Sequence, residues 1–397
     1  MMVERKMEMR PIILCFVSYY HPGYRSGGPV RSVANFVDHF ADEFDIRIVT
    51  RDRDMGDTEP YSEVQIDDWN QIGKSHVFYA SERTLSLRGI SHLLRDTPHD
   101  LLYLNSFFAF PFTVLPLLVR RLGIVPKHPC VIAPRGEFSS GAISLKALKK
   151  HLYLIAAHLT GLYRSLHCQA SSELEAQDIR RKFGVLAKSI HVAPDLPPKL
   201  QADSDISSTQ QTRAPGPLRI IFLSRISPMK NLDFLLRALI KVTRPLELAI
   251  YGPAEDKKYW SICESLIEQL PDNVRAKYLG EVTPDQVHDV FAVNDLFIFP
   301  TRGENFGHVI LESLTAGTPV LISDQTFWQA DDAGGITTLA LSETSCWVKE
   351  ISRYAQLDYV SLKNLRLAAR SIAEKTLNNK EAVLASKTLF EKAVRLH

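Results

Sequence analysis

Short apolar runs recur along the whole chain, and the segments between them carry apolar residues at helical spacing. Continuously apolar runs predict parallel strands buried on both faces, and the intervening segments predict helices. This alternation predicts an α/β fold with parallel, doubly wound sheets. In the first half the expected strands are residues 12–17, 45–50, 76–79, 101–105, 130–133, 165–170 and 190–192. In the second half they are 218–223, 247–251, 276–279, 296–299 and 320–323, with 336–341 as a weaker sixth.

The two halves are separated by residues 199–217, which are rich in Ser, Asp, Gln, Thr and Pro and have no hydrophobic period. Such a segment predicts a linker. A length of 397 residues suits two domains. We therefore expect an N-terminal domain over 1–198 and a C-terminal domain over 218–377. Residues 378–397 alternate charged and apolar positions at helical spacing and predict a final helix.

One strand–loop–helix–strand unit in the second half carries candidate chemistry. The apolar strand 296–299 leads into the loop 301–307, which holds two glycines. A helix follows over 308–316, Gly317 ends it, and the next apolar strand is 319–322. Ligands of open α/β sheets bind outside the carboxyl ends of the strands, and a helix N-terminus at that edge attracts an anion. The unit therefore predicts an anion site.

Two carboxylates, Glu304 in the loop and Glu312 in the helix, lie on this unit. A carboxylate accepts hydrogen bonds from neighbouring hydroxyls, so the pair suits a polyhydroxy ligand whose phosphates lie at the helix start. The alternative is that both residues are merely solvated. Arg225 and Lys230 flank a turn that follows the strand 218–223. Arginine grips phosphate oxygens in a fork and lysine acts as a point charge, although charged loop residues are usually solvated.

Two features of the first half are further candidates. Gly27 and Gly28 follow the first strand and let backbone approach a ligand at the start of a helix, but they also suit a plain turn. Arg135 follows the strand that ends at residue 133, and Glu137 lies two residues further on. Arg135 either contacts an anionic substrate or pairs with Glu137.

The second-half unit resembles the donor-site signature of retaining family-four glycosyltransferases of the GT-B fold. The matching residues are Glu304, Phe306-Gly307, Glu312 and Ala316-Gly317-Thr318-Pro319-Val320. The resemblance implies two Rossmann-like domains facing across a cleft, with the acceptor in the first and a nucleotide sugar in the second. It also implies a final helix that crosses back to the first domain, although a simple capping helix is the alternative.

The resemblance assigns roles to single residues. Arg225 and Lys230 correspond to the diphosphate clamp, with Ser224 where glycine is common, and Glu304 would hold hydroxyls of the donor sugar. Glu312 would hold the ribose. The remaining implied ligand contacts come from Gly27, Gly28, Gly252, Asn305, Phe306 and Gly307. Many relatives carry a histidine near the donor sugar where this chain has Arg135, which departs from the family pattern.

The implied reaction is transfer of a sugar from UDP or GDP to an acceptor hydroxyl with retention, and Arg225, Lys230 and Glu304 are the expected catalytic residues. We expect no metal and no other cofactor, because Asp52-Arg53-Asp54 matches a metal motif only in letters and precedes a polar loop. The implied acceptor is a glycan or a lipid-linked glycan of a bacterial envelope. A nucleotide-sugar epimerase and a non-catalytic nucleotide-sugar-binding protein are the alternatives.

Composition bears on the partners of the protein and on the compartment in which it is expected. The net charge of +2 gives no reason to expect a nucleic-acid partner. The 5 cysteines are far apart and form no Cys-x-x-Cys pair, which favours a reducing, cytoplasmic compartment over a disulfide framework. The apolar run 12–17 is too short to cross a bilayer, and prolines interrupt 107–119, so we expect no transmembrane helix.

Residues 144–167 predict a long helix with one basic and one apolar side. Its basic residues are Lys146, Lys149, Lys150 and Arg164, and its apolar ones are Leu145, Leu148, Leu152, Ile155, Leu159 and Leu162. Such a helix either rests on an anionic membrane surface at the inner face or packs its apolar stripe into the core.

Overall fold

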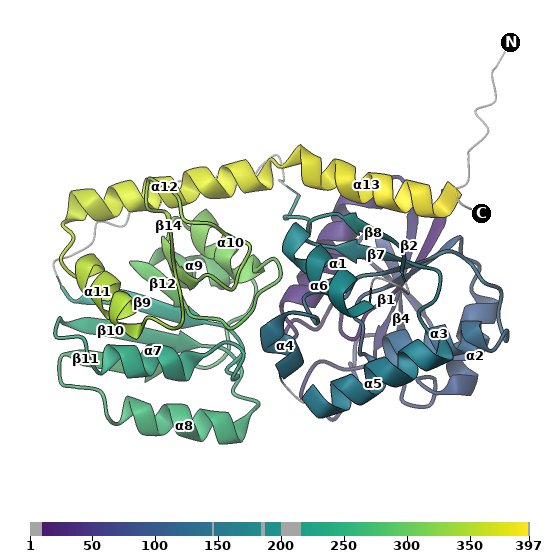
Figure 1. Ribbon diagram of the computed structural model, residues 1–397, viewed down its shortest axis with the longest axis horizontal. Helices are drawn as coiled ribbons and strands as arrows, with labels where there is room; N and C mark the ends of the chain where they lie inside the picture. The colour runs from purple at the N-terminus through teal and green to yellow at the C-terminus, as the bar shows by residue number, and fades with distance from the viewer. Residues whose placement is uncertain (1–9, 145–146, 184–186, 200–215, 396–397) are drawn as a thin grey trace, which may run out of the picture. The chain divides into compact units, whose positions relative to one another are not determined.

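The computed structural model describes residues 10–144, 147–183, 187–199 and 216–395 (Figure 1). The chain divides into two compact units. Unit 1 comprises Met1–Ser139, Ile143–Lys199 and Lys380–His397, and unit 2 comprises Ser140–Ala142 and Leu200–Asn379. Most of the predicted linker, 199–217, lies outside the described residues.

Unit 1 is built on a sheet in the order β3-β4-β2-β1-β5-β6-β7-β8. Its strands are β1 (Ile12–Phe16), β2 (Asp45–Arg51), β3 (Trp69–Ile72), β4 (Ser75–Ala80), β5 (Leu101–Leu104), β6 (Cys130–Ile132), β7 (Leu166–Ala170) and β8 (Ala187–Val192). All neighbours are parallel except β3 and β4. The parallel arrangement confirms the fold expected for this half. The hairpin strand β3, which turns into β4 at Gly73 (φ 56°), is absent from the prediction.

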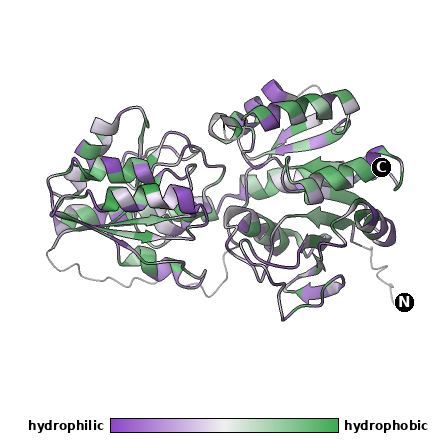
Figure 2. Cartoon of the chain, turned by 90° about the horizontal axis from the view of Figure 1, so that it is seen from below, coloured by the Kyte–Doolittle hydropathy of each residue, from purple (hydrophilic) through white to green (hydrophobic). Residues whose placement is uncertain are grey.

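Helices cover both faces of this sheet. They are α1 (Gly28–Phe40), α2 (Leu87–Asp96), α3 (Leu115–Arg121), α5 (Ala147–Thr160), α6 (Glu173–Phe183) and α13 (Lys380–Arg395), with a π-helical turn η1 at Phe110–Val114. The short helix α4 (Ser140–Ser144) begins in unit 2 and ends in unit 1. In β1, Ile13 and Cys15 pack with α1 and α13, whereas Leu14 and Phe16 pack with α2, α3 and α6. This alternation is the period of a strand buried on both faces. The helices carry hydrophobic and hydrophilic residues together (Figure 2), as expected of covering helices.

The C-terminal helix α13 is part of the unit 1 core. The Phe390 ring lies 4.7 Å from the Phe36 ring and 4.9 Å from the Tyr103 ring, measured between centroids. Lys387 also forms an ion pair of 2.7 Å with Glu43. The aromatic contacts therefore fix the last helix against α1 and β5.

Unit 2 has a six-stranded, wholly parallel sheet in the order β11-β10-β9-β12-β13-β14. Its strands are β9 (Leu218–Leu223), β10 (Leu246–Tyr251), β11 (Val274–Tyr278), β12 (Leu296–Phe299), β13 (Val320–Ser323) and β14 (Ile336–Leu339). Its helices are α7 (Leu232–Leu239), α8 (Lys257–Ile267), α9 (Val287–Ala292), α10 (His308–Thr315), α11 (Thr344–Tyr354) and α12 (Tyr359–Leu377). The chain order reverses between β9 and β12, and at such a switch point a Rossmann-like sheet binds its ligand.

The prediction of one long helix over 144–167 is wrong. Helix α5 ends at Thr160, and Gly161 (φ 59°) and Ser165 (φ 64°) adopt left-handed backbone that turns the chain into β7. The alternative that the apolar stripe packs into the core is also wrong for its central residues. The exposed fractions are 75% for Leu148, 60% for Leu152, 53% for Ile155 and 80% for Leu159. Leu145 and Lys146 lie outside the described residues.

Other expectations concern cysteines and membrane spans. Cys15, Cys130, Cys168 and Cys263 are buried, as expected of small core residues, and Cys346 is half-buried. None of the described helices combines the length and the apolar character that crossing a bilayer requires.

Candidate functional site

The loops that follow β9 and β12, at the switch point of unit 2, are joined by hydrogen bonds. The Arg302 backbone N–H donates to the Met229 carbonyl (2.8 Å), and the Asn231 amide donates to the Pro300 carbonyl (2.9 Å). The Arg302 guanidinium donates twice to Asn231 Oδ1, at 3.0 and 2.9 Å. Residues 224–231 and 300–304 therefore form one surface, although about 70 residues separate them in sequence.

This junction brings Lys230 and Glu304 into direct contact. The Lys230 ammonium donates to the Glu304 carboxylate, and only 12% and 18% of these side chains are exposed. Lys230 Nζ also lies 5.3 Å from the centre of the Phe299 ring. An ammonium and a carboxylate with so little access to water interact more strongly than a pair on an open surface. The two predicted residues therefore occupy one shielded position at the switch point.

Arg225 is an exposed residue in the same loop. The next residue, Ile226, donates its N–H to the Pro253 carbonyl (3.0 Å), which ties this loop to the turn after β10. Gly252 in that turn has φ 127°, and a Cβ placed on it would lie 1.9 Å from the Ser224 carbonyl oxygen. Glycine is required here because the backbones of Ser224 and Gly252 touch. Contact of Arg225, Ser224 and Gly252 with a ligand stays a prediction.

We expect Gly252→Ala to destabilise unit 2 strongly, because the methyl group would overlap the Ser224 carbonyl oxygen. The cost should be about 3 kcal/mol or more, measured by urea unfolding. Gly280→Ala is the matched control, since Gly280 also has a positive φ (82°) but its Cβ would meet nothing within 4 Å. Equal losses in the two variants would show that backbone strain alone, and not the contact with Ser224, requires glycine.

The N-terminus of α10 lies beside this junction, since a Cβ on Gly307 would be 3.0 Å from Glu304 Cγ. Gly307 is the N-cap residue, with φ 74° and no side-chain cap. The N–H groups of Phe306 and Gly307 donate to no residue within the described parts of the chain. Open N–H groups and the helix dipole favour an anion at this place. The half-buried Asn305 precedes them, and the half-buried Glu312 lies in the second turn of α10.

The Phe306 side chain has a structural role. Its ring is buried against Phe327 and Trp328, and its carbonyl accepts a hydrogen bond from Trp328 Nε1 (2.6 Å). The Glu304 N–H donates to the Gln325 carbonyl (3.1 Å). The loop after β13 therefore holds the 304–307 backbone in place.

Sequence reasoning missed Asn231, Arg302 and Gln325, which hold the junction together. Asn231 offers a signal that could have been read, because asparagine tolerates the left-handed backbone better than most residues, and here its φ is 65°. An asparagine between a basic turn and an apolar helix therefore indicates a tight cap. Arg302 and Gln325 carry no such signal.

Gly27 and Gly28 occupy the equivalent place in unit 1. They follow β1 and begin α1, next to the point where the strand order reverses between β1 and β5. Gly27 is the N-cap with φ 67°, and a Cβ on either glycine would meet nothing within 4 Å. The position suits the close approach of a ligand, and ligand contact itself stays a prediction.

Of the two alternatives for Arg135, pairing with Glu137 is wrong. Arg135 forms an ion pair with Asp195 and donates to the Tyr103 hydroxyl (2.6 Å) and to Asn105 Oδ1 (2.9 Å). Glu137 instead accepts from the N–H groups of residues 107 and 108 and from the Ser106 hydroxyl, and burial raises the pKa of this carboxyl. Left-handed backbone at residues 135 and 136 separates the two side chains. Contact of Arg135 with a substrate remains untested.

The segment that contains this geometry matches a family of known proteins. Residues 203–331 match the family described as glycosyl transferases group 1. This matched segment, about a third of the chain, is similar to the glycosyl transferases group 1. The matched segment includes Arg225, Lys230, Glu304 and Glu312. The family match therefore contains the whole junction between the loops after β9 and β12.

Sequence relatives match only part of the chain. A D-inositol 3-phosphate glycosyltransferase of Rhodococcus erythropolis is 28% identical over 165 residues, which are 39% of this chain and 37% of that protein. A phosphatidyl-myo-inositol mannosyltransferase of Mycobacterium leprae is 28% identical over 170 residues, 41% of this chain and 44% of that protein. The chain thus spans less than half of the length of these relatives.

Solved structures match the fold of the whole chain. Sucrose-phosphate synthase from Thermosynechococcus elongatus superposes with a TM-score of 0.73 at 16% identity, over 98% of this chain and all (100%) of that chain. HepE from Anabaena, solved with UDP-glucose, gives a TM-score of 0.65 at 16% identity, over 96% and 98% of the two chains. The fold is that of GT-B glycosyltransferases, as the sequence predicts.

Proposed function

We propose that the protein is a retaining glycosyltransferase that moves a sugar from a nucleoside diphosphate sugar to an acceptor hydroxyl. The observation that carries this proposal is the contact of Lys230 with Glu304 beside the open N-terminus of α10. A cation, a carboxylate and free N–H groups at a switch point match a ligand that presents phosphate and hydroxyl groups side by side.

The chemistry requires stabilisation of negative charge on the departing diphosphate. Lys230, Arg225 and the N–H groups of residues 306 and 307 supply fixed positive charge and dipoles without a metal. Glu304 would accept hydrogen bonds from the sugar hydroxyls. A donor that offers a phosphate oxygen to the ammonium and a hydroxyl to the carboxylate would satisfy both members of the Lys230–Glu304 pair at once.

Retention of configuration would follow from attack on the same face that the diphosphate leaves. The acceptor oxygen forms the new bond to the anomeric carbon as the bond to phosphate breaks, and a leaving phosphate oxygen takes the acceptor proton. No enzymatic nucleophile is needed in this scheme. We expect turnover to be the same with and without EDTA, and a loss that added divalent metal restores would contradict the metal-independent scheme.

The donor nucleotide is UDP or GDP in this proposal, and the structure of HepE with UDP-glucose is consistent with the first. The acceptor in this proposal is a bacterial glycan or a lipid-linked glycan, and the name of the Mycobacterium leprae relative, a phosphatidyl-myo-inositol mannosyltransferase, is consistent with a lipid acceptor. A lipid-linked acceptor would place the enzyme in the cytoplasm at the inner face of the membrane.

The experiment that tests the proposal has two stages. Thermal shift with a panel of nucleoside diphosphates identifies the base, because a ligand that binds only the native state raises the Tm. The matching nucleotide sugars are then incubated with and without glycan acceptors, and NMR reports the anomeric configuration of the product. Epimer formation without acceptor would indicate an epimerase, and tight donor binding without any turnover would indicate a binding protein.

Glu312→Ala should weaken donor binding while leaving the fold intact, because we assign this carboxylate to the ribose hydroxyls. Loss of hydrogen bonds to a charged group should raise the Kd by roughly 10–100-fold, measured by titration calorimetry with the nucleoside diphosphate. Glu374→Ala, at an exposed position of α12, is the control. An unchanged Kd in Glu312→Ala would remove the ribose role.

A further inference from the structure

Helix α5 presents an apolar stripe outward. Tyr153, Leu154 and Ala157 pack on the unit 1 core, so the helix already has a buried face. Leu148, Leu152, Ile155 and Leu159 lie on another side, and each of them is more than half exposed. Scattered exposed leucines need no explanation, but four at helical spacing on one helix form a contiguous apolar surface.

The surroundings of this stripe are basic. No Asp or Glu occurs between Glu137 and Glu173, a stretch that contains all of α5 and the turn after it. Lys149 is exposed on α5, and Arg164 is exposed in the turn. A helix with an apolar stripe, basic neighbours and no acidic residue is the pattern of helices that lie on anionic bilayers.

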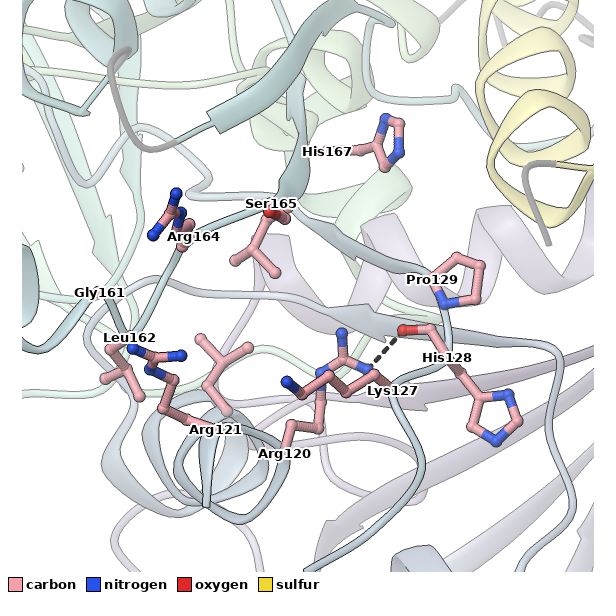
Figure 3. A pocket seen from close by; sticks show the side chains of 12 residues that line it. Arg120, Arg121, Lys127, His128, Pro129, Gly161, Leu162, Arg164, Ser165 and His167 are labelled. Atoms are coloured by element: carbon pink, nitrogen blue, oxygen red, sulfur yellow. Dashed lines mark hydrogen bonds between the residues drawn. The ribbon is translucent and has the colours of Figure 1, made fainter. Parts of the chain in front are cut away.

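A basic pocket of about 440 Å³ begins where α5 ends. Four arginine and lysine side chains line it (Figure 3). They are Arg120 and Arg121 at the end of α3, Lys127 in the loop before β6 and Arg164 in the turn before β7. No carboxylate belongs to its lining. Within the described part of the chain none of the four forms an ion pair, so their charge is not neutralised there.

Two of these arginines also hold the backbone of the pocket. Arg120 Nη1 donates to the His128 carbonyl (2.5 Å), and Arg121 Nε donates to the Thr160 carbonyl (3.1 Å). The second bond fixes the pocket to the last residue of α5, directly after Leu159. Arg120 and Arg121 therefore position the pocket, whereas Lys127 and Arg164, which are exposed as Arg121 is, are the cations that we assign to a ligand.

The pocket lies at the amino ends of β6 and β7, because its residues directly precede these strands. The Gly27–Gly28 loop follows the carboxyl end of β1, and the strands are parallel. The two features therefore occupy opposite edges of the unit 1 sheet. This pocket is not part of the predicted acceptor or donor site.

We propose that the outward face of α5 and the basic pocket form a docking surface for a bilayer rich in anionic phospholipid. The leucines and Ile155 enter the interface between headgroups, and Lys127 and Arg164 bind a lipid phosphate at the pocket. Both halves of the surface match one partner, since a lipid presents an apolar chain and an anionic headgroup side by side.

Other occupants fit less well. A second copy of the chain docked through the same face would place two basic surfaces against each other, and like charges at an interface repel. A free phosphate would bind the pocket but give no role to an exposed apolar stripe. A lipid surface therefore accounts for the charge and the leucines together, and this docking does not depend on the proposed transferase activity.

The test is co-sedimentation of the full chain with vesicles of phosphatidylcholine alone or mixed with phosphatidylglycerol. We expect binding to the mixed vesicles that falls as salt is raised, and much weaker binding to the neutral ones. Lys127→Gln with Arg164→Gln should weaken binding by about 30-fold, the combined effect of two cations near an anionic surface. Leu152→Gln with Leu159→Gln should weaken it by at least about tenfold.

Matched controls change the same residue types elsewhere. Lys363→Gln with Lys375→Gln removes two exposed cations of α12, and Leu367→Gln with Leu384→Gln alters two exposed leucines of α12 and α13. Both should bind mixed vesicles like the unaltered protein. Failure of the unaltered protein to bind, or equal losses in test and control variants, would overturn the proposal. A dimer in light scattering that only Leu152→Gln with Leu159→Gln dissociates would assign the face to self-association instead.

Discussion

Lys230→Ala and Arg225→Ala are each expected to lower turnover of the nucleotide sugar by about 10²–10³-fold, the usual effect of removing a group that stabilises charge in the transition state. Lys230 is held at the switch point by Glu304 and by the ring of Phe299, so its charge is preorganised. Steady-state kinetics with saturating donor measures the effect. Lys241→Ala, at an exposed position after α7, is the control and should retain normal turnover.

A second variant separates catalysis from simple destabilisation. Replacing Lys230 leaves the Glu304 carboxylate largely buried without its cation, which alone destabilises the loop. The double variant Lys230→Ala with Glu304→Gln removes that stranded charge. We expect it to recover thermal stability but not turnover. Recovery of turnover, or near-normal activity in both Lys230→Ala and Arg225→Ala, would show that the clamp is misplaced.

Gly307→Ala is expected to have the second large effect, a loss of donor binding and turnover of roughly 100-fold. A Cβ at this position would lie 2.9 Å from Ile310 Cδ1 and 3.0 Å from Glu304 Cγ, so the Ile310 side chain must shift and Glu304 must give by a few tenths of an ångström. Small displacements of positioning groups cost about 10²-fold in rate. Calorimetry with the nucleoside diphosphate and steady-state kinetics measure the two losses.

The control for Gly307→Ala is Gly73→Ala in the β3–β4 hairpin. Gly73 also has a positive φ (56°), but its Cβ would meet nothing within 4 Å. Both substitutions force a non-glycine residue into the left-handed region, which costs about 1 kcal/mol. Similar losses of Tm with a loss of donor binding only in Gly307→Ala would fit our assignment. Normal donor binding by Gly307→Ala would mean that Glu304 does not hold the donor.

Much of the fold could be predicted because its determinants are local. Buried parallel strands read as continuous apolar runs, and this pattern marks β9, β12 and β13 within a residue or two. The strand β3 escaped prediction because Trp69–Ile72 is a short edge strand with partly exposed residues and no apolar run. The end of α5 escaped because an apolar spacing continues past Thr160, whereas the left-handed turn at Gly161 and Ser165 decides where the helix stops.

In the candidate site, too, local features could be predicted from the sequence and long-range contacts could not. Lys230 and Glu304 could be identified as candidate site residues from the sequence, because the strand pattern places both in loops at the carboxyl ends of strands. The partner of Arg135 could not be predicted, because Asp195 lies 60 positions further along the chain and only tertiary packing brings the two together. The exposure of the α5 leucines could not be predicted either, since the helical period alone does not say which of two apolar faces is buried.

The most direct test of the central claim is a calorimetric comparison of a nucleoside diphosphate with the corresponding monophosphate. If the 224–231 and 300–307 loops hold the diphosphate, the diphosphate should bind about 30-fold more tightly, as expected for added charge-assisted hydrogen bonds. The double variant Arg225→Ala with Lys230→Ala should then bind the two nucleotides with nearly equal Kd. A preference that survives unchanged in the double variant would contradict the claim.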